Sequence, residues 1–252
     1  ASTVRAPRAV ARDRQAERDR QSASPAGWGL NAKDFGAVGD GVADDAKALS
    51  AAIDAATRQG RTLLLPAGTY RVNSTVNVPA EDGENGAALR HALRMVGEGY
   101  LSQIVAAVPM HAVLNLSCLS GPTEGAAAPI PMENVYIADL SVSAAGLANF
   151  SVFAPGIARS RFERLEIGGA LTAGLSIGYG WCNYVEGCRF SGNEIGLHTY
   201  NSANNIDVIN TIFEGNTGVG YYISGGAQIN VEGCVIEGNG GPVVVVMVAI
   251  GV

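Results

Sequence analysis

The sequence has few charged residues, few aromatic residues and no long apolar run. Charged residues make up 16% of the 252 residues, and aromatic residues make up 6%. No run reaches the roughly 18 apolar residues that a membrane-spanning helix needs, so no transmembrane segment is expected within the chain. The formal net charge of −6 argues against a nucleic-acid-binding surface.

Runs of helix-forming residues are also scarce. Gly occurs 33 times, and Gly, Asn and Val interrupt the Ala-, Leu- and Glu-rich stretches that a helical repeat would need. The leucine signature of leucine-rich repeats is absent as well. With 47% hydrophobic residues, the chain can bury the core of one domain. The composition therefore favours a single domain with many tight corners.

The sequence does contain one pattern that occurs three times between Tyr184 and Gly240. The copies occupy residues 184–193, 207–216 and 230–239, and each begins 23 positions after the last. Gly-Asn closes all three copies. A fixed period of this length indicates identical supersecondary units that stack on one another.

Within each copy, apolar residues lie three and then two positions apart. This spacing indicates two short strands joined by a bend, both with side chains pointing inward, so equivalent positions form columns. The asparagine column is expected at a tight corner, where Asn tolerates left-handed backbone angles and can pair its amide with its neighbours. The columns are Val185, Val208 and Val231; Cys188, Thr211 and Cys234; Phe190, Phe213 and Ile236; and Asn193, Asn216 and Asn239.

The repeat predicts an all-β fold in which each copy is one turn of a parallel β-helix. Residues 162–167 fit the same template one period upstream of Val185, and residues 135–142 fit it about 25 residues earlier. We therefore predict a β-helix domain over residues 31–252, with regular coils from about 135 to 252. Residues 80–94 and 120–131 are expected to be loops.

Residues 1–30 form a separate region, rich in Arg and Ala. They contain no apolar segment, so they are not an intact secretory signal. We expect an extended or flexible arm, with docking to a partner as the alternative.

A cap is predicted over residues 34–60. A Gly-Asp-Gly turn at 39–41 precedes Asp44 or Asp45, either of which would cap an amphipathic helix that ends at Gly60. Such a helix would cover the strand edges at the first turn of the β-helix. Two strands are expected after it, at 62–65 and 69–72.

Residues 34–56, followed by 63–70, resemble the N-terminal signature of the pectate-lyase-like superfamily, which has rhamnogalacturonase-, epimerase- and phage-tailspike-type members. Residues 96–99 resemble its next turn, and Ala46 departs from the usual Thr. With the repeats, the resemblance covers roughly residues 31–240. It implies a right-handed parallel β-helix and a carbohydrate-active class. The signature residues are structural, so the resemblance leaves the chemistry open.

Four cysteines do not fix the redox compartment. Cys188 and Cys234 lie two coils apart, roughly twice the ~4.8 Å strand spacing, and this exceeds the reach of a disulfide. We expect both to be core thiols, whereas Cys118 and Cys182 could pair. The compartment stays open, with an extracellular or organelle-lumen location favoured.

By the same resemblance, polysaccharide cleavage would occur on the outer face of one sheet. The repeats predict that Glu186 and Asp207 lie there on adjacent strands, roughly 8 Å apart from the strand spacings. This overlaps the ~6.5–9.5 Å between the carboxyl groups of inverting glycosidases, so both are catalytic candidates. Ordinary surface residues are the alternative interpretation. Candidates for substrate binding are Arg161, which could hold a uronate carboxylate, Tyr184, which could stack on a sugar, Glu163 and Glu232.

Several family motifs are missing from the sequence. The paired aspartates, Gly-His-Gly and Arg-x-Lys of polygalacturonases do not occur, nor does an Asp-Pro-His of the epimerase kind. No Asp cluster or metal-ligand spacing is evident, so neither a metal nor another cofactor is expected. His91 and His111 have no partner at a suggestive spacing. His198 could face outward beside Tyr221 as a surface residue, but the inward register stays open, because Tyr221 and Ile223 imply a different face from Leu197 and Thr199.

Residues 243–252 are apolar, and an uncovered β-helix end exposes strand edges. We expect a further stretch of chain, a second copy or a protein partner to cover this end.

Two functional hypotheses follow from the sequence. The favoured one is a carbohydrate-active or carbohydrate-binding protein that acts on polysaccharide by hydrolysis or β-elimination. The alternative is a non-catalytic β-helix that serves as a structural or interaction subunit of a larger assembly.

Overall fold

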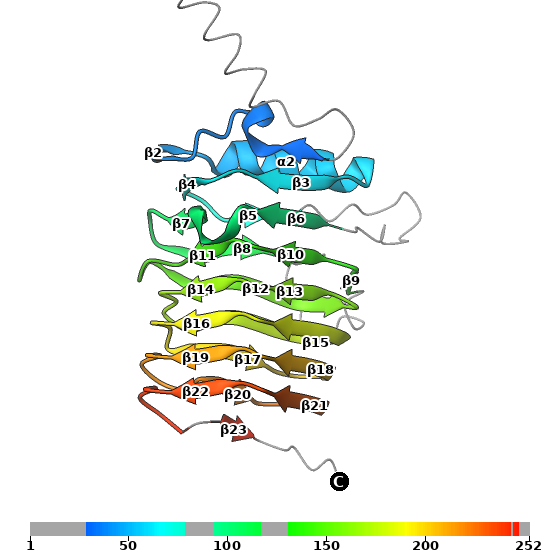
Figure 1. Ribbon diagram of the computed structural model, residues 1–252, viewed down its shortest axis with the longest axis vertical. Coiled ribbons are helices and arrows are strands. Elements are labelled where there is room, and N and C mark those ends of the chain that lie inside the picture. The colour runs from blue at the N-terminus through cyan, green and yellow to red at the C-terminus, as the bar shows by residue number, and fades with distance from the viewer. Residues whose placement is uncertain (1–28, 79–92, 117–130, 243, 247–252) are drawn as a thin grey trace, which may run out of the picture.

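The computed structural model describes residues 29–78, 93–116, 131–242 and 244–246. The chain winds into a tube of stacked coils, a right-handed parallel β-helix, as the sequence predicts (Figure 1). Every strand pairing in the described chain is parallel. The predicted loops at 80–94 and 120–131 and the predicted arm at 1–30 lie almost wholly outside the described residues.

Each coil contributes a strand to each of three faces, here called A, B and C. β15 (Ala173–Glu186) belongs to two of them: its residues 173–179 lie on the C face, and its residues 180–186 lie on the A face. The A face contains β1 (Leu30–Asn31), β3 (Thr62–Leu65), β6 (Arg94–Gly97), β10 (Tyr136–Ala138), β13 (Arg161–Glu163), β15 (Ala173–Glu186), β18 (Ala203–Ile209) and β21 (Ala227–Glu232).

The B face contains β2 (Asp40–Asp44), β4 (Gly68–Val72), β7 (Ser102–Ala106), β11 (Ser141–Ser143), β14 (Glu166–Gly168), β16 (Arg189–Ser191), β19 (Ile212–Glu214) and β22 (Val235–Glu237). The C face contains β5 (Val76–Asn77), β8 (Met110–Asn115), β12 (Ala148–Ala158), β15, β17 (Ile195–Thr199), β20 (Tyr221–Ile223) and β23 (Val244–Val246). β9 (Met132–Glu133) pairs with the end of β12.

The predicted columns are confirmed by the strand register. Val185 pairs with Val208, which pairs with Val231. Phe190 and Phe213 stack inside the tube, with ring centroids 5.1 Å apart. The first two valines are fully buried, whereas Val231 is 39% exposed because it lies on the last described strand of the A face.

The asparagine column forms a ladder between the B and C faces. The side-chain oxygens of Asn193 and Asn216 each accept the backbone N–H one coil earlier, from Ala170 and Asn193 respectively. Asn239 does the same for Asn216. The prediction that asparagine occurs at this corner because it adopts left-handed backbone angles was wrong. The residue with the left-handed conformation is the preceding glycine, for example Gly192 at φ 67°, and the asparagines do not have positive φ.

The N-terminal cap helix is α2 (Ala46–Gln59), and it ends at Gly60 in the left-handed conformation. It follows η1 (Ala32–Phe35), and a second short helix, η2 (Gly99–Leu101), precedes β7. The carboxylate of Asp44 accepts the first helical N–H, from Ala46, at 3.1 Å. Asp45 occupies the N-cap position but binds the N–H groups of Val38 and Gly39 instead. The predicted turn at 39–41 leads directly into β2.

The thiols of Cys182, Cys188 and Cys234 are free. Cys188 is a buried core thiol, as predicted, and burial raises its pKa to about 12. Cys234 is only partly buried, near the last described coil. Cys118 lies outside the described residues, and the thiol of Cys182, its possible partner, is free in this structure. No helix among the described residues is long and apolar enough to span a membrane.

We predict that Asn216→Ala lowers the free energy of unfolding by about 2–4 kcal/mol. The change leaves the buried N–H of Asn193 and the carbonyl of Phe190 without their partners, and each loss costs ~1–3 kcal/mol. Denaturant unfolding would measure it. Asn149→Ala, at an exposed position, is the control and should stay within about 0.5 kcal/mol of the parent. Equal effects of the two changes would contradict a structural ladder.

Candidate functional site

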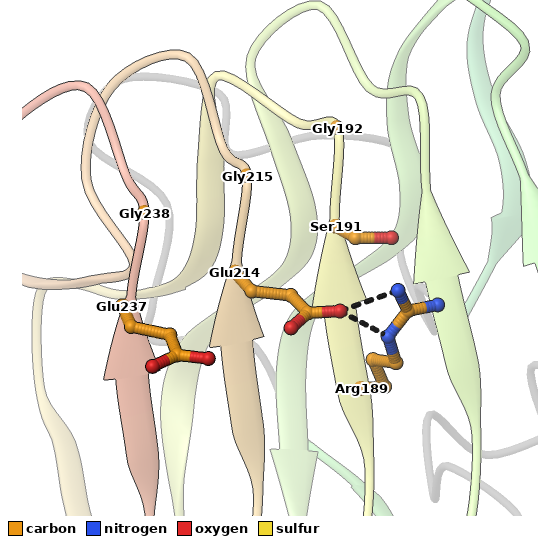
Figure 2. Close-up of a pocket in the computed structure, with 7 residues that line it drawn as sticks. All are labelled: Arg189, Ser191, Gly192, Glu214, Gly215, Glu237 and Gly238. Atoms are coloured by element: carbon orange, nitrogen blue, oxygen red, sulfur yellow. Dashed lines mark hydrogen bonds and ion pairs between the residues drawn. The ribbon is translucent and has the colours of Figure 1, made fainter.

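The B face carries a hollow of about 560 Å³ over β16, β19 and β22 (Figure 2). Arg189 lies between two carboxylates of neighbouring coils, Glu166 at 2.6 Å and Glu214, which accepts two of its N–H groups. The guanidinium is thus already paired on both sides. Glu237 follows Glu214 one coil later. Paired charges of this kind hold neighbouring coils together, and the hollow contains no aromatic ring.

The A face brings the sequence-predicted site residues onto neighbouring strands, in the expected register. Tyr184 pairs with Arg161 on one side and Asp207 on the other. Glu186 pairs with Glu163 and with Ile209, and Ile209 pairs with Glu232. Glu186 and Asp207 are therefore one strand and two residues apart, as predicted.

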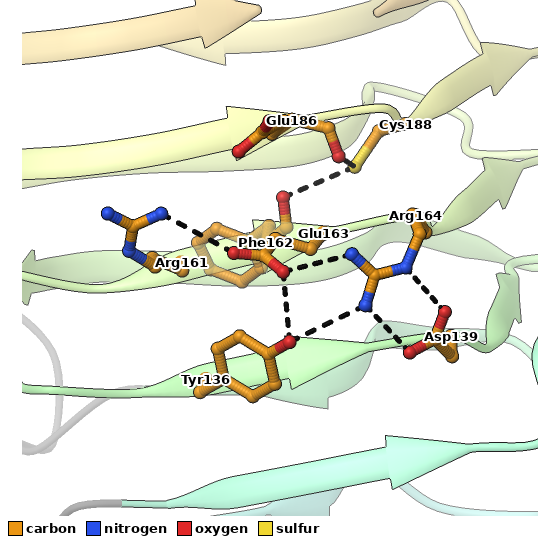
Figure 3. Close-up of polar contacts among 8 residues, drawn as sticks. All are labelled: Tyr136, Asp139, Arg161, Phe162, Glu163, Arg164, Glu186 and Cys188. Atoms are coloured by element: carbon orange, nitrogen blue, oxygen red, sulfur yellow. Dashed lines mark hydrogen bonds and ion pairs between the residues drawn. The ribbon is translucent and has the colours of Figure 1, made fainter.

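Glu163 is held in a network with three neighbours (Figure 3). The hydroxyl of Tyr136 donates a hydrogen bond to its carboxylate at 2.9 Å, and the guanidinium of Arg164 donates another at 3.0 Å. Two other nitrogens of Arg164 donate to the carboxylate of Asp139. Arg161 lies 3.4 Å away. Burial raises the pKa of Glu163, but the hydrogen bonds from Tyr136 and Arg164 outweigh it, so the net pKa lies below its usual value. Glu163 is an ionised, internally satisfied carboxylate.

Arg161 and Tyr184 contact each other directly. The guanidinium lies 4.2 Å from the centroid of the ring, and Arg94 covers Tyr136 in the same way at 4.1 Å. A uronate held by Arg161, or a sugar stacked on Tyr184, would compete with this contact. The two other candidates differ: Glu186 and Asp207 are partly exposed, and neither carboxylate makes an ion pair or hydrogen bond with any residue that the structure describes.

The C face carries an aromatic site that the sequence analysis missed. The imidazole of His198 is stacked between two tyrosine rings, Tyr200 at 5.2 Å and Tyr222 at 5.0 Å between centroids. Its Nε2 lies 2.8 Å from the hydroxyl oxygen of Ser224. Burial lowers the pKa of His198 below its usual 6.5, so the ring is neutral at pH 7.

His198, Tyr200 and Ser224 form one wall of a hollow of about 650 Å³ at the corner between the C and A faces, and Tyr222 packs on the His198 ring beside it. Asn201, Ser202 and Asn204 supply amide and hydroxyl groups to its lining, and Gly225 and Gly226 leave space beside them. Rings on one side and hydrogen-bonding groups on the other are the usual composition of a small-molecule or sugar site.

The aromatic surface continues along the tube toward the N-terminus. His198 shares an outward column with Ser176 and Phe153 on the two preceding strands. Ser176 is only 1% exposed, although it points outward, so the neighbouring side chains close over it. Phe153 packs against His111 and Phe150, with ring centroids 4.8 Å away in both cases. The C face therefore carries a column of aromatic side chains along the tube axis, from Phe153 to His198 and Tyr222, together with the rings that pack beside them. This column is called the aromatic strip below.

The predicted partner of His198 was wrong. His198 pairs with Tyr222, whereas Tyr221 pairs with Leu197 and points into the core. Four residues lie between Asn216 and Tyr221, but only three lie between Asn193 and Leu197. One extra residue at this corner shifts the register of β20, so a strict period of 23 pairs the wrong tyrosine.

Residues 29–243 match the family model described as rhamnogalacturonase A/epimerase, pectate lyase-like. The chain belongs to this family. Mannuronan C5-epimerase AlgE1 of Azotobacter vinelandii is 48% identical over 71 residues, which cover 28% of this chain and 5% of the epimerase. The chain therefore matches only a small part of the length of its curated relatives.

Solved structures agree on the fold of this pectate lyase-like chain. ORF18 of Geobacillus virus E2 is 21% identical, with a TM-score of 0.66, over 92% of this chain and 46% of its own. The A-module of mannuronan C-5 epimerase AlgE4 of Azotobacter vinelandii is 20% identical, with a TM-score of 0.54, over 85% of this chain and 73% of the module. Identities this low show a shared β-helix and nothing about the site.

No group of three or more His, Cys, Asp or Glu side chains that could hold a metal occurs in the described part of this family member. The site residues that sequence reasoning missed are Tyr200, Tyr222 and Ser224. A usable signal was present, because the alternation of Leu197, His198 and Thr199 already places the histidine outward when leucine and threonine point inward. The register of β20 against β17 was also needed to identify Tyr222 and Ser224 as neighbours of His198.

We predict that His198 titrates below pH 6.5 and that the fold loses stability as its ring becomes protonated. Because the folded-state pKa is lowered, the unfolded chain binds more protons, so the stabilisation is complete above about pH 6.5 and is lost as pH falls through the folded pKa. NMR titration of the imidazole and denaturant unfolding at several pH values would measure both. His198→Phe should abolish this component of the pH dependence. A pKa at or above 6.5 would contradict the analysis.

Proposed function

We propose that this protein binds polysaccharide on its C face, in the hollow beside His198, and belongs functionally to the carbohydrate-active members of its family. The observation that carries the proposal is the strip of rings next to clustered amides and hydroxyls. Aromatic faces pack against the apolar C–H faces of sugar rings, while amides and hydroxyls bond to sugar hydroxyls. The relatives named as mannuronan C5-epimerases support a polysaccharide ligand.

The geometry of the C face favours a chain-like ligand. Phe153, Ser176, His198 and Tyr222 follow one another on successive strands, so the strip runs along the tube axis. Successive strands lie about 4.8 Å apart, which is similar to the length of one sugar unit in an extended glycan. A polysaccharide lying along the axis would therefore meet Phe153, His198 and Tyr222 in turn, with a gap of one coil at the buried Ser176.

Cleavage requires groups that the described residues lining the C-face hollow do not supply, because none of them is a carboxylate. We propose Glu186 and Asp207 on the A face as the catalytic pair of a hydrolase, with Arg161, Glu163, Tyr184 and Glu232 around it. Their strand positions support a separation suited to an inverting mechanism. Their carboxylates, unlike that of Glu163, are unpaired among the described residues, so they would be free to act as the general acid and the general base.

Tyr200→Ala and Tyr222→Ala should each weaken binding of the polysaccharide by about tenfold, because each removes one ring of the stack around His198. Affinity electrophoresis against a panel of polysaccharides would measure this. Tyr100→Ala removes an exposed tyrosine from η2 and serves as the control, with no change expected. Binding that survives both C-face changes would place the glycan elsewhere.

Glu186→Gln and Asp207→Asn should each lower turnover by at least about 10²-fold, as expected for loss of a general acid or base. Release of reducing ends and absorbance of unsaturated uronides would follow hydrolysis and β-elimination separately. Glu237→Gln on the B face is the control. Undiminished activity in both A-face variants would eliminate this pair.

The alternative proposal is a non-catalytic β-helix that binds glycan or protein within a larger assembly. The absence of carboxylates from the described hollow lining favours binding without turnover. A protein partner at the apolar C-terminal end remains a prediction. A stable complex in native mass spectrometry, together with no turnover on any glycan, would favour this alternative over the enzyme.

A further inference from the structure

Charged side chains are unevenly distributed over the three faces. The A face carries Arg94, Arg161, Glu163, Glu186 and Asp207, and the B face carries Glu166, Arg189, Glu214 and Glu237. The C face has none: no Lys, Arg, Asp or Glu occurs in β5, β8, β12, β17, β20 or β23, or in residues 173–179 of β15. Among the described residues, this is the one face of the tube without charge.

The charges nearest in sequence to this face do not supply a cation. Arg159, directly after β12, pairs with the carboxylate of Glu133 at 3.1 Å. Glu194, directly before β17, is exposed and negative. His198 is neutral at pH 7, as its lowered pKa requires. The aromatic strip therefore has no Lys or Arg along its described length, and its basic groups there are the imidazoles of His111 and His198.

This absence of Lys and Arg decides between two classes of polysaccharide. A uronan carries one carboxylate on each sugar, and removing a carboxylate from water is costly unless a cation or several N–H donors receive it. Proteins that hold repeated carboxylates use Arg or Lys for this reason. A neutral glycan needs only ring faces, amides and hydroxyls, and these are the groups present around His198.

We propose that the C face selects neutral glycans and rejects uronans. This inference rests on the proposed function and names its substrate class. It would separate this chain from the mannuronan C5-epimerases that it resembles.

The test compares two hexasaccharides of the same linkage, one of β-1,4-linked glucose and one of β-1,4-linked mannuronate. Calorimetry at low and high salt would measure both affinities. The protein should bind the neutral hexasaccharide at least about tenfold more tightly, and salt should leave that affinity unchanged because no ion pair forms. Equal or tighter binding of the mannuronate, or neutral binding that salt weakens, would overturn the proposal.

A gain-of-function variant provides the matched control. Asn204→Lys places a cation in the lining of the hollow and should strengthen mannuronate binding several-fold in a salt-dependent way. Gln103→Lys adds the same charge on the B face and should change neither affinity. If Asn204→Lys leaves mannuronate binding unchanged, lack of a cation is not what excludes uronans, and the inference fails.

The same variants separate this inference from the proposed function. If neither hexasaccharide binds, or if Tyr200→Ala and Tyr222→Ala leave both affinities intact, the glycan site on the C face is refuted. If both tyrosine variants weaken binding but the mannuronate is the preferred ligand, the site stands and only its neutral selectivity is overturned.

Discussion

The register between successive coils is the constraint on which the rest of this structure depends. Parallel hydrogen bonds place each residue directly above its equivalent, so a column in the sequence becomes a stack in space. An inward column can contain asparagine only because the side-chain oxygen of each asparagine accepts a backbone N–H from the neighbouring coil. Removing one amide leaves two coils with unpaired groups, so these polar columns restrict the register more strongly than the valines do.

The same register gives each outer face its own chemistry. On the A and B faces, opposite charges on adjacent coils pair with one another, as Arg164 does with Asp139 and Arg189 with Glu214. Such pairs are partly exposed and contribute modestly to stability, but they neutralise the surface locally. On the C face, rings pack against one another across coils instead: His198 stacks on Tyr222, and His111 contacts Phe153 edge to face. A ligand that needs cations and a ligand that needs ring faces would therefore prefer different sides of one tube.

Most of the fold could be predicted from the sequence because its information is periodic. The valine, cysteine and phenylalanine columns follow from spacing alone, and so does the pairing of Tyr184 with Asp207. The site was harder because spacing says nothing about which neighbour a long side chain chooses. Arg161 covers the ring of Tyr184, and Glu163 is bound by Tyr136 and Arg164, contacts that depend on side-chain conformation. The partner of His198 was missed because one extra residue breaks the period.

The hollow beside His198 is a consequence of how tightly the coils close at their corner. A Cβ on Gly225 would lie 2.6 Å from the carbonyl oxygen of Asn201, and one on Gly226 would collide with the carbonyl of Ala203. Backbone packing therefore requires glycine at both positions, whatever ligand binds there. The choice left to the sequence is the rim, whose described residues include one tyrosine, one histidine, amides and hydroxyls, with no charge among them. Because the concavity is a property of the fold and the rim is not, the rim is where the ligand preference of this protein is determined.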